Sequence, residues 1–209
     1  MNRAAVGRVS EEVDALVFVE ESLGENHARF LDAVEAFRGL QASLCVVAPP
    51  AAFSAELAEE FRQITAKLAK FQVPNDEQYV RLSDLPGRNH PVVVPWSFQQ
   101  LGERTMVASV EFTEAHLGGN GAVHGGVIPL LFDDLLGIFV SRKGQEGSRT
   151  AYLKTNYRKI TPIGKVLRVE ASIDSIEGRK TMVSGRLFDG EHLLVDAEAL
   201  FVRLLPGQP

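Results

Sequence analysis

The chain has 209 residues, of which 45% are hydrophobic, which is enough to bury the core of one domain with an extension. Its net charge of -5 argues against nucleic acid as the main partner, because phosphate binding needs a basic field. The single cysteine, Cys45, excludes an internal disulfide framework and favours a reducing, cytoplasmic location. The apolar run at residues 15–19 is too short for a signal sequence or a membrane span.

The first half of the chain shows helical periodicity. Apolar residues recur at helical spacing from His27 to Leu44, and the prolines at positions 49 and 50 then break the pattern. A second helix is predicted from an N-cap at Ser54 to about Phe71. Its apolar face consists of Leu57, Phe61, Ile64 and Leu68.

A loop-rich linker around residues 73–91 follows these helices, with proline, glycine and asparagine in "VPNDEQ" and "LPGRNHP". We therefore predict a helical N-terminal extension over residues 1–90 and a second domain over residues 91–209.

The second half of the chain changes to the two-residue period of strands. Apolar and polar side chains alternate in "TMVASVEF", "VLRVEASIDSI" and "HLLVDAEALFVRL". The Asp189–Gly190 pair indicates a hairpin between the last two strands. One-sided alternation implies an antiparallel sheet with one covered face.

A helix predicted from Gly126 to about Arg142 is the element that covers this face. It is apolar nearly all round, which is typical of a buried helix. We therefore predict an α+β hot-dog fold, in which a curved antiparallel sheet wraps around a long buried helix.

The stretch "NGAVHGGVIPLLFDD", residues 120–134, carries the features that thioester chemistry needs. Gly125 and Gly126 allow the backbone to approach a ligand closely, and Pro129 fits the first turn of a helix. The free N–H groups and positive dipole end of that helix would face the glycine turn. A thioester carbonyl placed there would be stabilised as it becomes an oxyanion.

Two adjacent acids end this stretch. Asp133 lies between Phe132 and Leu135, so its carboxyl is expected to resist ionisation unless a cleft solvates it. Such an acid suits a base or a nucleophile, whereas the alternative is a helix acid that faces water. Asp134 points about 100° away around the helix, and periodicity alone does not choose between the two.

The segment "HGGVIPLLFD" resembles the HGG-type acyl-CoA thioesterases of the hot-dog superfamily, which include the phenylacetate-pathway type and the human thioesterase-superfamily-member type. In that pattern the acid lies nine positions after the histidine. The acid of this chain at that position is Asp133, and the resemblance leaves Asp134 with a structural role. The resemblance continues through "TAYLKTNYRKITPIGKVLRVEASIDSIEGRK" and "LLVDAEALFVRL", and covers roughly residues 92–205.

The resemblance implies a role for each of four residues. The Gly125 N–H would polarise the thioester carbonyl, and His124 would position the substrate or the turn. Asp133 would activate water or attack directly, and Thr150 would hold the attacking water. In this family the acid and the glycine amide usually come from opposite subunits. The resemblance therefore implies a homo-oligomer, a dimer or a tetramer, with the active site at the subunit interface.

Substrate contacts are expected from further polar and basic residues. Many relatives have Asn or Gln six residues before the histidine, where this chain has Gly118. Asn120 either compensates for that difference or is a turn residue with left-handed tendency. The basic candidates sit near strand ends, where they could meet the phosphates of coenzyme A, or they are ordinary surface charges. The substrate-binding candidates are Gly126, Asn120, Asn156, Arg158, Lys159, Arg179 and Lys180.

The predicted function is hydrolysis of an acyl-CoA, with a fatty or aryl acyl group, to the free acid and coenzyme A. No cofactor is expected, since coenzyme A enters with the substrate, and the five scattered histidines form no metal-binding motif. Two alternatives stay open, a hot-dog enoyl-CoA hydratase or dehydratase and a non-catalytic acyl-CoA-binding regulator or scaffold. The N-terminal helices fit partner binding, dimer contacts or a lid over the acyl chain.

Overall fold

The computed structural model describes residues 24–81, 87, 89–143 and 145–208. The apolar run at residues 15–19 and part of the predicted linker lie outside the described residues. Within them, no helix is long and apolar enough to cross a membrane.

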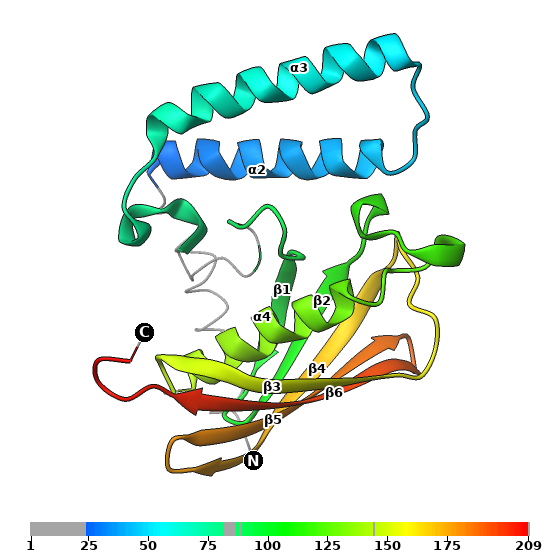
Figure 1. Ribbon diagram of the computed structural model, residues 1–209. Helices are drawn as coiled ribbons and strands as arrows, with labels where there is room; N and C mark the ends of the chain where they lie inside the picture. Colours follow the sequence, from blue (N-terminus) through cyan, green and yellow to red (C-terminus); the bar gives the residue numbers. More distant parts are fainter. Residues whose placement is uncertain (1–23, 82–86, 88, 144, 209) are drawn as a thin grey trace.

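The N-terminal part is a helical hairpin. Helix α2 (Glu25–Leu44) lies between helix α3 (Ala51–Leu68) and the sheet (Figure 1). Both predicted helices are confirmed, but the predicted N-cap at Ser54 is wrong. The N-cap is Pro50, and its carbonyl accepts the Ser54 N–H at 3.0 Å. Helix α3 starts earlier because Ala51 and Ala52 are good helix formers that can follow the proline directly.

The hairpin continues into three short 3-10 turns, η1 (Ala69–Phe71), η2 (Asn75–Glu77) and η3 (Tyr79–Arg81). The ring of Tyr79 stacks on His27 with centroids 5.1 Å apart and meets Phe30 edge-on. These contacts hold the end of the hairpin against the start of α2. Helix α3 buries no side chain, and Ile64 and Leu68 of its apolar face are 51% and 65% exposed.

Six antiparallel strands form one curved sheet. They are β1 (Trp96–Leu101), β2 (Thr105–Glu111), β3 (Ser148–Tyr157), β4 (Val166–Glu177), β5 (Lys180–Asp189) and β6 (His192–Arg203). Their order across the sheet is β1-β2-β4-β5-β6-β3, so β1 and β3 are the edges. The predicted hairpin between β5 and β6 is confirmed, with Asp189 pairing with His192 around Gly190 and Glu191.

Helix α4 (Val127–Arg142) lies in the hollow of this sheet and contacts β3, β5 and β6 (Figure 1). Phe132, Leu135 and four other large side chains of α4 are completely buried. Gly185 of β5 makes room for the helix, because a Cβ atom there would lie 2.7 Å from the Phe132 ring. The predicted α+β hot-dog fold is therefore confirmed, with its core between α4 and the sheet.

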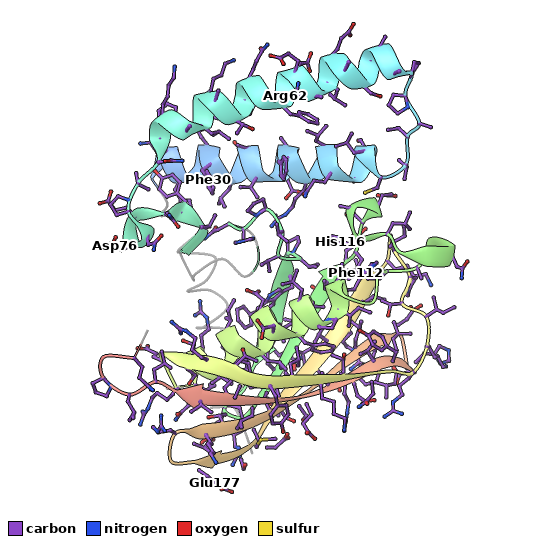
Figure 2. The ribbon with its side chains drawn as sticks, in the orientation of Figure 1. Phe30, Arg62, Asp76, Phe112, His116 and Glu177 are labelled. Carbon is purple, nitrogen blue, oxygen red and sulfur yellow. The ribbon has the colours of Figure 1, made fainter. Side chains whose placement is uncertain are left out.

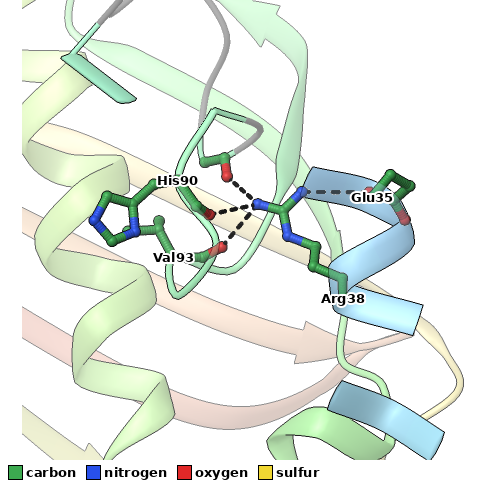
Figure 3. Close-up of polar contacts among 5 residues, drawn as sticks. Glu35, Arg38, His90 and Val93 are labelled. Carbon is green, nitrogen blue, oxygen red and sulfur yellow. Dashed lines mark hydrogen bonds and ion pairs between the residues drawn. The ribbon is translucent and has the colours of Figure 1, made fainter. Parts of the chain in front are cut away.

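Arg38 joins α2 to the segment that leads into β1. Its side chain is 12% exposed, and its Nη2 atom donates to the carbonyl oxygens of Gly87, His90 (2.8 Å) and Val93 (3.3 Å) (Figure 3). Its Nη1 atom lies 3.3 Å from Glu35. One buried guanidinium thus fixes the helical part to the sheet part. The division at residues 90 and 91 stays a prediction.

Candidate active site

The glycine turn before α4 is built from two short turns, η4 (Glu114–His116) and η5 (Gly119–Gly121). Asn120 has the left-handed conformation, with φ 57°, that the turn interpretation predicted. A Cβ atom on Gly118 would lie 2.7 Å from the Cα atom of His124. The backbone here therefore has no room for the Asn or Gln side chain that many relatives carry at this position.

His124 organises the start of α4 through three hydrogen bonds. Its N–H donates to the His116 carbonyl at 2.8 Å, and its own carbonyl accepts the Val127 N–H at 2.9 Å. Its Nδ1 atom accepts the Gly126 N–H at 3.1 Å. The Gly126 amide is thus already engaged, so Gly126 contributes to the candidate site as the N-cap of α4 and not as a free donor.

The Gly125 N–H is the amide that is left to meet a ligand. It has no acceptor among the residues that the structure describes. Because the peptide bond is trans, this N–H points opposite to the His124 carbonyl, which is directed into the helix. It therefore points outwards from the N-terminal end of α4, where the helix dipole favours a negative charge.

Tyr157, the last residue of β3, fixes the next peptide. Its hydroxyl donates to the Gly125 carbonyl at 2.6 Å. The Gly125–Gly126 peptide is thus held at both ends, by Tyr157 at its carbonyl and by His124 at its N–H. Tyr157 lies in the segment "NYRKITPIG", but no local pattern in the sequence marks it as part of the site. A partner 32 residues away leaves no mark in local periodicity.

The two acids of α4 have different surroundings. Asp134 is partly buried and accepts a hydrogen bond from Trp96 Nε1 at 2.8 Å. Burial raises the pKa of the Asp134 carboxyl, and this outweighs the opposite effect of the Trp96 hydrogen bond. Asp133 is exposed in the single chain, on the opposite side of the helix from the buried Phe132 and Leu135. In one chain Asp133 therefore fits the alternative of a helix acid that faces water, and Asp134 is the acid that is partly buried.

One chain does not bring all the candidate residues together. Asp133 follows Gly126, the N-cap of α4, by seven residues, which is about 10 Å along the helix axis. Thr150 is exposed and precedes Tyr157 by seven residues on β3, about 23 Å along an extended strand. Asp133 and Thr150 therefore lie away from the Gly125 amide of the same chain.

The polar candidates fall at two ends of the sheet. Asn156 and Arg158 both bind Asp196, at the end where Tyr157 meets the glycine turn, and the Arg158 guanidinium lowers the pKa of the Asp196 carboxyl. At the same end, the Nζ atom of Lys159 lies 3.3 Å from the Nδ1 atom of His192.

Arg179 and Lys180 lie at the other end. Lys180 pairs with Val202, which also pairs with Arg149 of β3, and Arg179 donates to the Arg203 carbonyl. Within one chain the four basic residues therefore cannot surround one group of phosphates. Among the described residues, no three His, Cys, Asp or Glu side chains are close enough to hold a metal ion.

Comparison with known proteins finds similarity to one family over the glycine turn and the strands that follow it. The model of the thioesterase superfamily matches residues 120–195, which include the glycine turn, α4 and strands β3 to β5. A mouse protein, acyl-coenzyme A thioesterase THEM4, is 37% identical over 97 residues, 45% of this chain and 41% of its own length. Its Xenopus laevis counterpart is 33% identical over 112 residues, 52% of this chain and 50% of its own. The matched part thus spans about half the length of these curated relatives or less.

A solved crystal structure of a thioesterase superfamily protein is similar over most of the chain. It has a TM-score of 0.71 and 26% sequence identity, and the match covers 83% of this chain and 90% of that one. Residues 91–209 alone could not supply 83% of the chain. The similarity therefore extends into the helical N-terminal part.

Proposed function

We propose that the chain is an acyl-CoA thioesterase of the thioesterase superfamily, whose model matches residues 120–195, and that it converts an acyl-CoA and water into a free acid and coenzyme A. The observation that carries this proposal is the Gly125 N–H at the positive end of a buried helix, in a peptide whose other end, the His124 carbonyl, is fixed by the Val127 N–H. A donor placed in advance is what a developing oxyanion requires. The names of the mouse and frog relatives support the choice of substrate.

The proposed reaction uses two groups of the chain. The thioester oxygen accepts a hydrogen bond from the Gly125 N–H, and the carbonyl carbon becomes more electrophilic. Asp133 either takes a proton from water while the water oxygen bonds to this carbon, or attacks the carbon itself, in which case water later hydrolyses the resulting acyl-aspartate anhydride to the free acid and restores the carboxylate. The C–S bond then breaks, and the thiolate leaves with a proton as coenzyme A. The step is redox-neutral, and coenzyme A enters only as part of the substrate.

We propose that a second copy of the chain completes the site. The outer edge of β3 has no partner strand among the described residues, and a long open edge favours pairing with another chain. Antiparallel pairing of two β3 strands centred near Leu153 would place Thr150 of one copy beside Tyr157 of the other. Asp133 and Thr150 of one copy would then face Gly125 of the second, which explains why one chain keeps them apart.

In this arrangement Asn156, Arg158 and Lys159 lie at the mouth of the site, where the two basic side chains would meet the phosphates of coenzyme A in addition to their contacts with Asp196 and His192. Arg179 and Lys180 would approach the same mouth from the second copy. Asn120 belongs to the turn beside this mouth. The single, unpaired Cys45 supports a cytoplasmic location for the protein.

The test is release of thiol from a panel of acyl-CoA substrates by the wild type, Asp133→Asn and Asp134→Asn. Loss of the base is expected to lower kcat by about 100-fold or more in Asp133→Asn. Asp134→Asn, which keeps an acceptor for Trp96, serves as the matched control and should retain most of the activity. Equal rates for the wild type and Asp133→Asn would contradict the proposed role.

The same protein preparations separate the two alternatives. Hydration of crotonyl-CoA, followed by the loss of ultraviolet absorbance, would indicate a hydratase. Tight binding of acyl-CoA without thiol release from any substrate would indicate a regulator or scaffold.

A further inference from the structure

A cavity of about 290 Å³ lies where α2 meets the start of α4. One wall is a single stripe of α2, since Glu35, Arg38, Gly39 and Ala42 follow helical spacing. The opposite wall consists of Pro91, Val92, Val93 and Pro95 from the segment before β1, with His116 and with Val127 and Leu130 of α4. The cavity thus exists only because the helical N-terminal part is held against the sheet part.

The cavity adjoins the candidate active site. Val127 belongs to the first turn of α4, and its N–H binds the carbonyl of His124. The His116 carbonyl, on the other side, accepts the His124 N–H (Figure 2 shows His116 beside Phe112). Leu130 precedes Asp133 and Asp134 by three and four residues, so it lies on the same side of the helix as these acids. A group bound at the glycine turn could therefore extend directly into the cavity.

The chemistry of the walls selects an uncharged ligand. The walls are mostly apolar, and the four carboxylate or guanidinium side chains at the cavity are Glu35, Glu111, Glu114 and Arg38. Arg38 is already engaged by backbone carbonyls and by Glu35. The three carboxylates outnumber the single cation, which is already engaged. An acyl group that carries a free carboxylate would therefore be repelled here. The volume is about twice the 150 Å³ of a cavity known to hold benzene, which corresponds to about six to ten carbons.

We infer that this cavity binds the acyl group of the substrate, and that α2 thereby selects uncharged acyl groups of about six to ten carbons. The inference rests on the proposed thioesterase function. Gly39 of α2 is one of the residues that line the cavity. It lies inside α2, where glycine costs about 1 kcal/mol relative to alanine, and a Cβ atom there would meet nothing within 4 Å. A larger side chain at this position would point into the space that the acyl group needs.

The test compares kcat/KM for octanoyl-CoA and acetyl-CoA in Gly39→Leu, Gly39→Ala and the wild type. Leucine forms helix better than glycine, so folding is not at risk. In Gly39→Leu the ratio of octanoyl-CoA to acetyl-CoA kcat/KM should fall at least about tenfold, since a filled subsite is worth 1.4 kcal/mol or more. Gly39→Ala should lower it less. Ala66→Leu, on the exposed surface of α3, is the matched control and should leave the ratio unchanged. An unchanged ratio in Gly39→Leu would overturn the inference, even if both rates fall.

A binding measurement separates this inference from the proposed function. Trp96 is the only tryptophan of the chain and follows Pro95 of the cavity wall. Octanamide, an uncharged probe, should change Trp96 fluorescence saturably in the wild type and not in Gly39→Leu. If the wild type hydrolyses no acyl-CoA but shows this behaviour, the cavity assignment stands and the enzymatic proposal fails. If the wild type shows no saturable change, the cavity assignment fails whatever the activity.

Discussion

The indole Nε1–H of Trp96 donates a hydrogen bond to Asp134 Oδ2 at 2.8 Å and so joins the first residue of β1 to the middle of α4. Trp96 is 2% exposed, which leaves its N–H no access to water as a substitute partner. The contact gives Asp134 a structural role and separates it from its neighbour Asp133, which is exposed.

Asp134→Ala should therefore lower the free energy of unfolding by about 1–3 kcal/mol, because the buried indole N–H loses its acceptor. Asp134→Asn keeps an acceptor and should cost less. Urea unfolding of the three proteins at pH 7 measures both changes. Equal losses for the two variants would show that the hydrogen bond is not the cause.

The same pair predicts a pH dependence. Burial raises the folded-state pKa of Asp134 above its ordinary value of 3.8, so the folded state binds its proton more tightly than the unfolded state. The stability of the wild type relative to Asp134→Asn should accordingly be greatest below pH 3.8 and decline as the pH rises through the folded-state pKa. Unfolding curves of both proteins over this window give the difference. A difference that is independent of pH would contradict the prediction.

His116 should act in the opposite direction. Burial and the nearby charge of Arg38 lower its pKa below 6.5, so the unfolded state takes up the proton first. The contribution of His116 to the free energy of unfolding should be fully present above pH 6.5. It should decline as the pH falls from there through the lower folded-state pKa. His116→Gln cannot titrate and should lack this component. The measurement is the melting temperature of both proteins from pH 7.5 downwards, and parallel curves would refute the assignment.

Tyr157→Phe should reduce the turnover of acyl-CoA by about tenfold, since it releases one end of the Gly125–Gly126 peptide and loses about 1.4 kcal/mol of transition-state stabilisation. The residue is 53% exposed, so the free energy of unfolding should change by only about 0.5 kcal/mol. Tyr152→Phe is the matched control on the same strand, because that hydroxyl binds Glu198 away from the glycine turn. Similar rates for the two variants would remove the role given to Tyr157.

Arg38→Met should loosen the helical part from the sheet part. The substitution keeps an aliphatic side chain of similar length but removes every donor to Gly87, His90 and Val93. We expect faster amide hydrogen exchange in α2 and a melting temperature lower by several degrees. Arg62→Met, which breaks only the exposed ion pair with Glu59, should change neither. Unchanged exchange in α2 of Arg38→Met would show that other contacts hold the helix in place.

The secondary-structure elements and the fold class could be predicted from the amino-acid sequence. Helical and strand periods are local, so the two N-terminal helices, α4 and the alternating strands were predictable, and the one-sided strands required a covering helix. The glycine turn and its position before α4 could also be predicted, because glycine and proline act through their own backbone angles. A resemblance to known enzymes then singled out Asp133.

The role of each polar group could not be predicted in the same way, because it depends on contacts between distant parts of the chain. Trp96 reaches Asp134 across 38 positions, Tyr157 reaches Gly125 across 32, and Arg38 reaches Gly87 across 49. Periodicity reports the face on which a residue lies but not what packs against that face. For this reason the exposure of Asp133, the shifted pKa of Asp134 and the cavity behind the glycine turn depend on how distant segments of the chain meet.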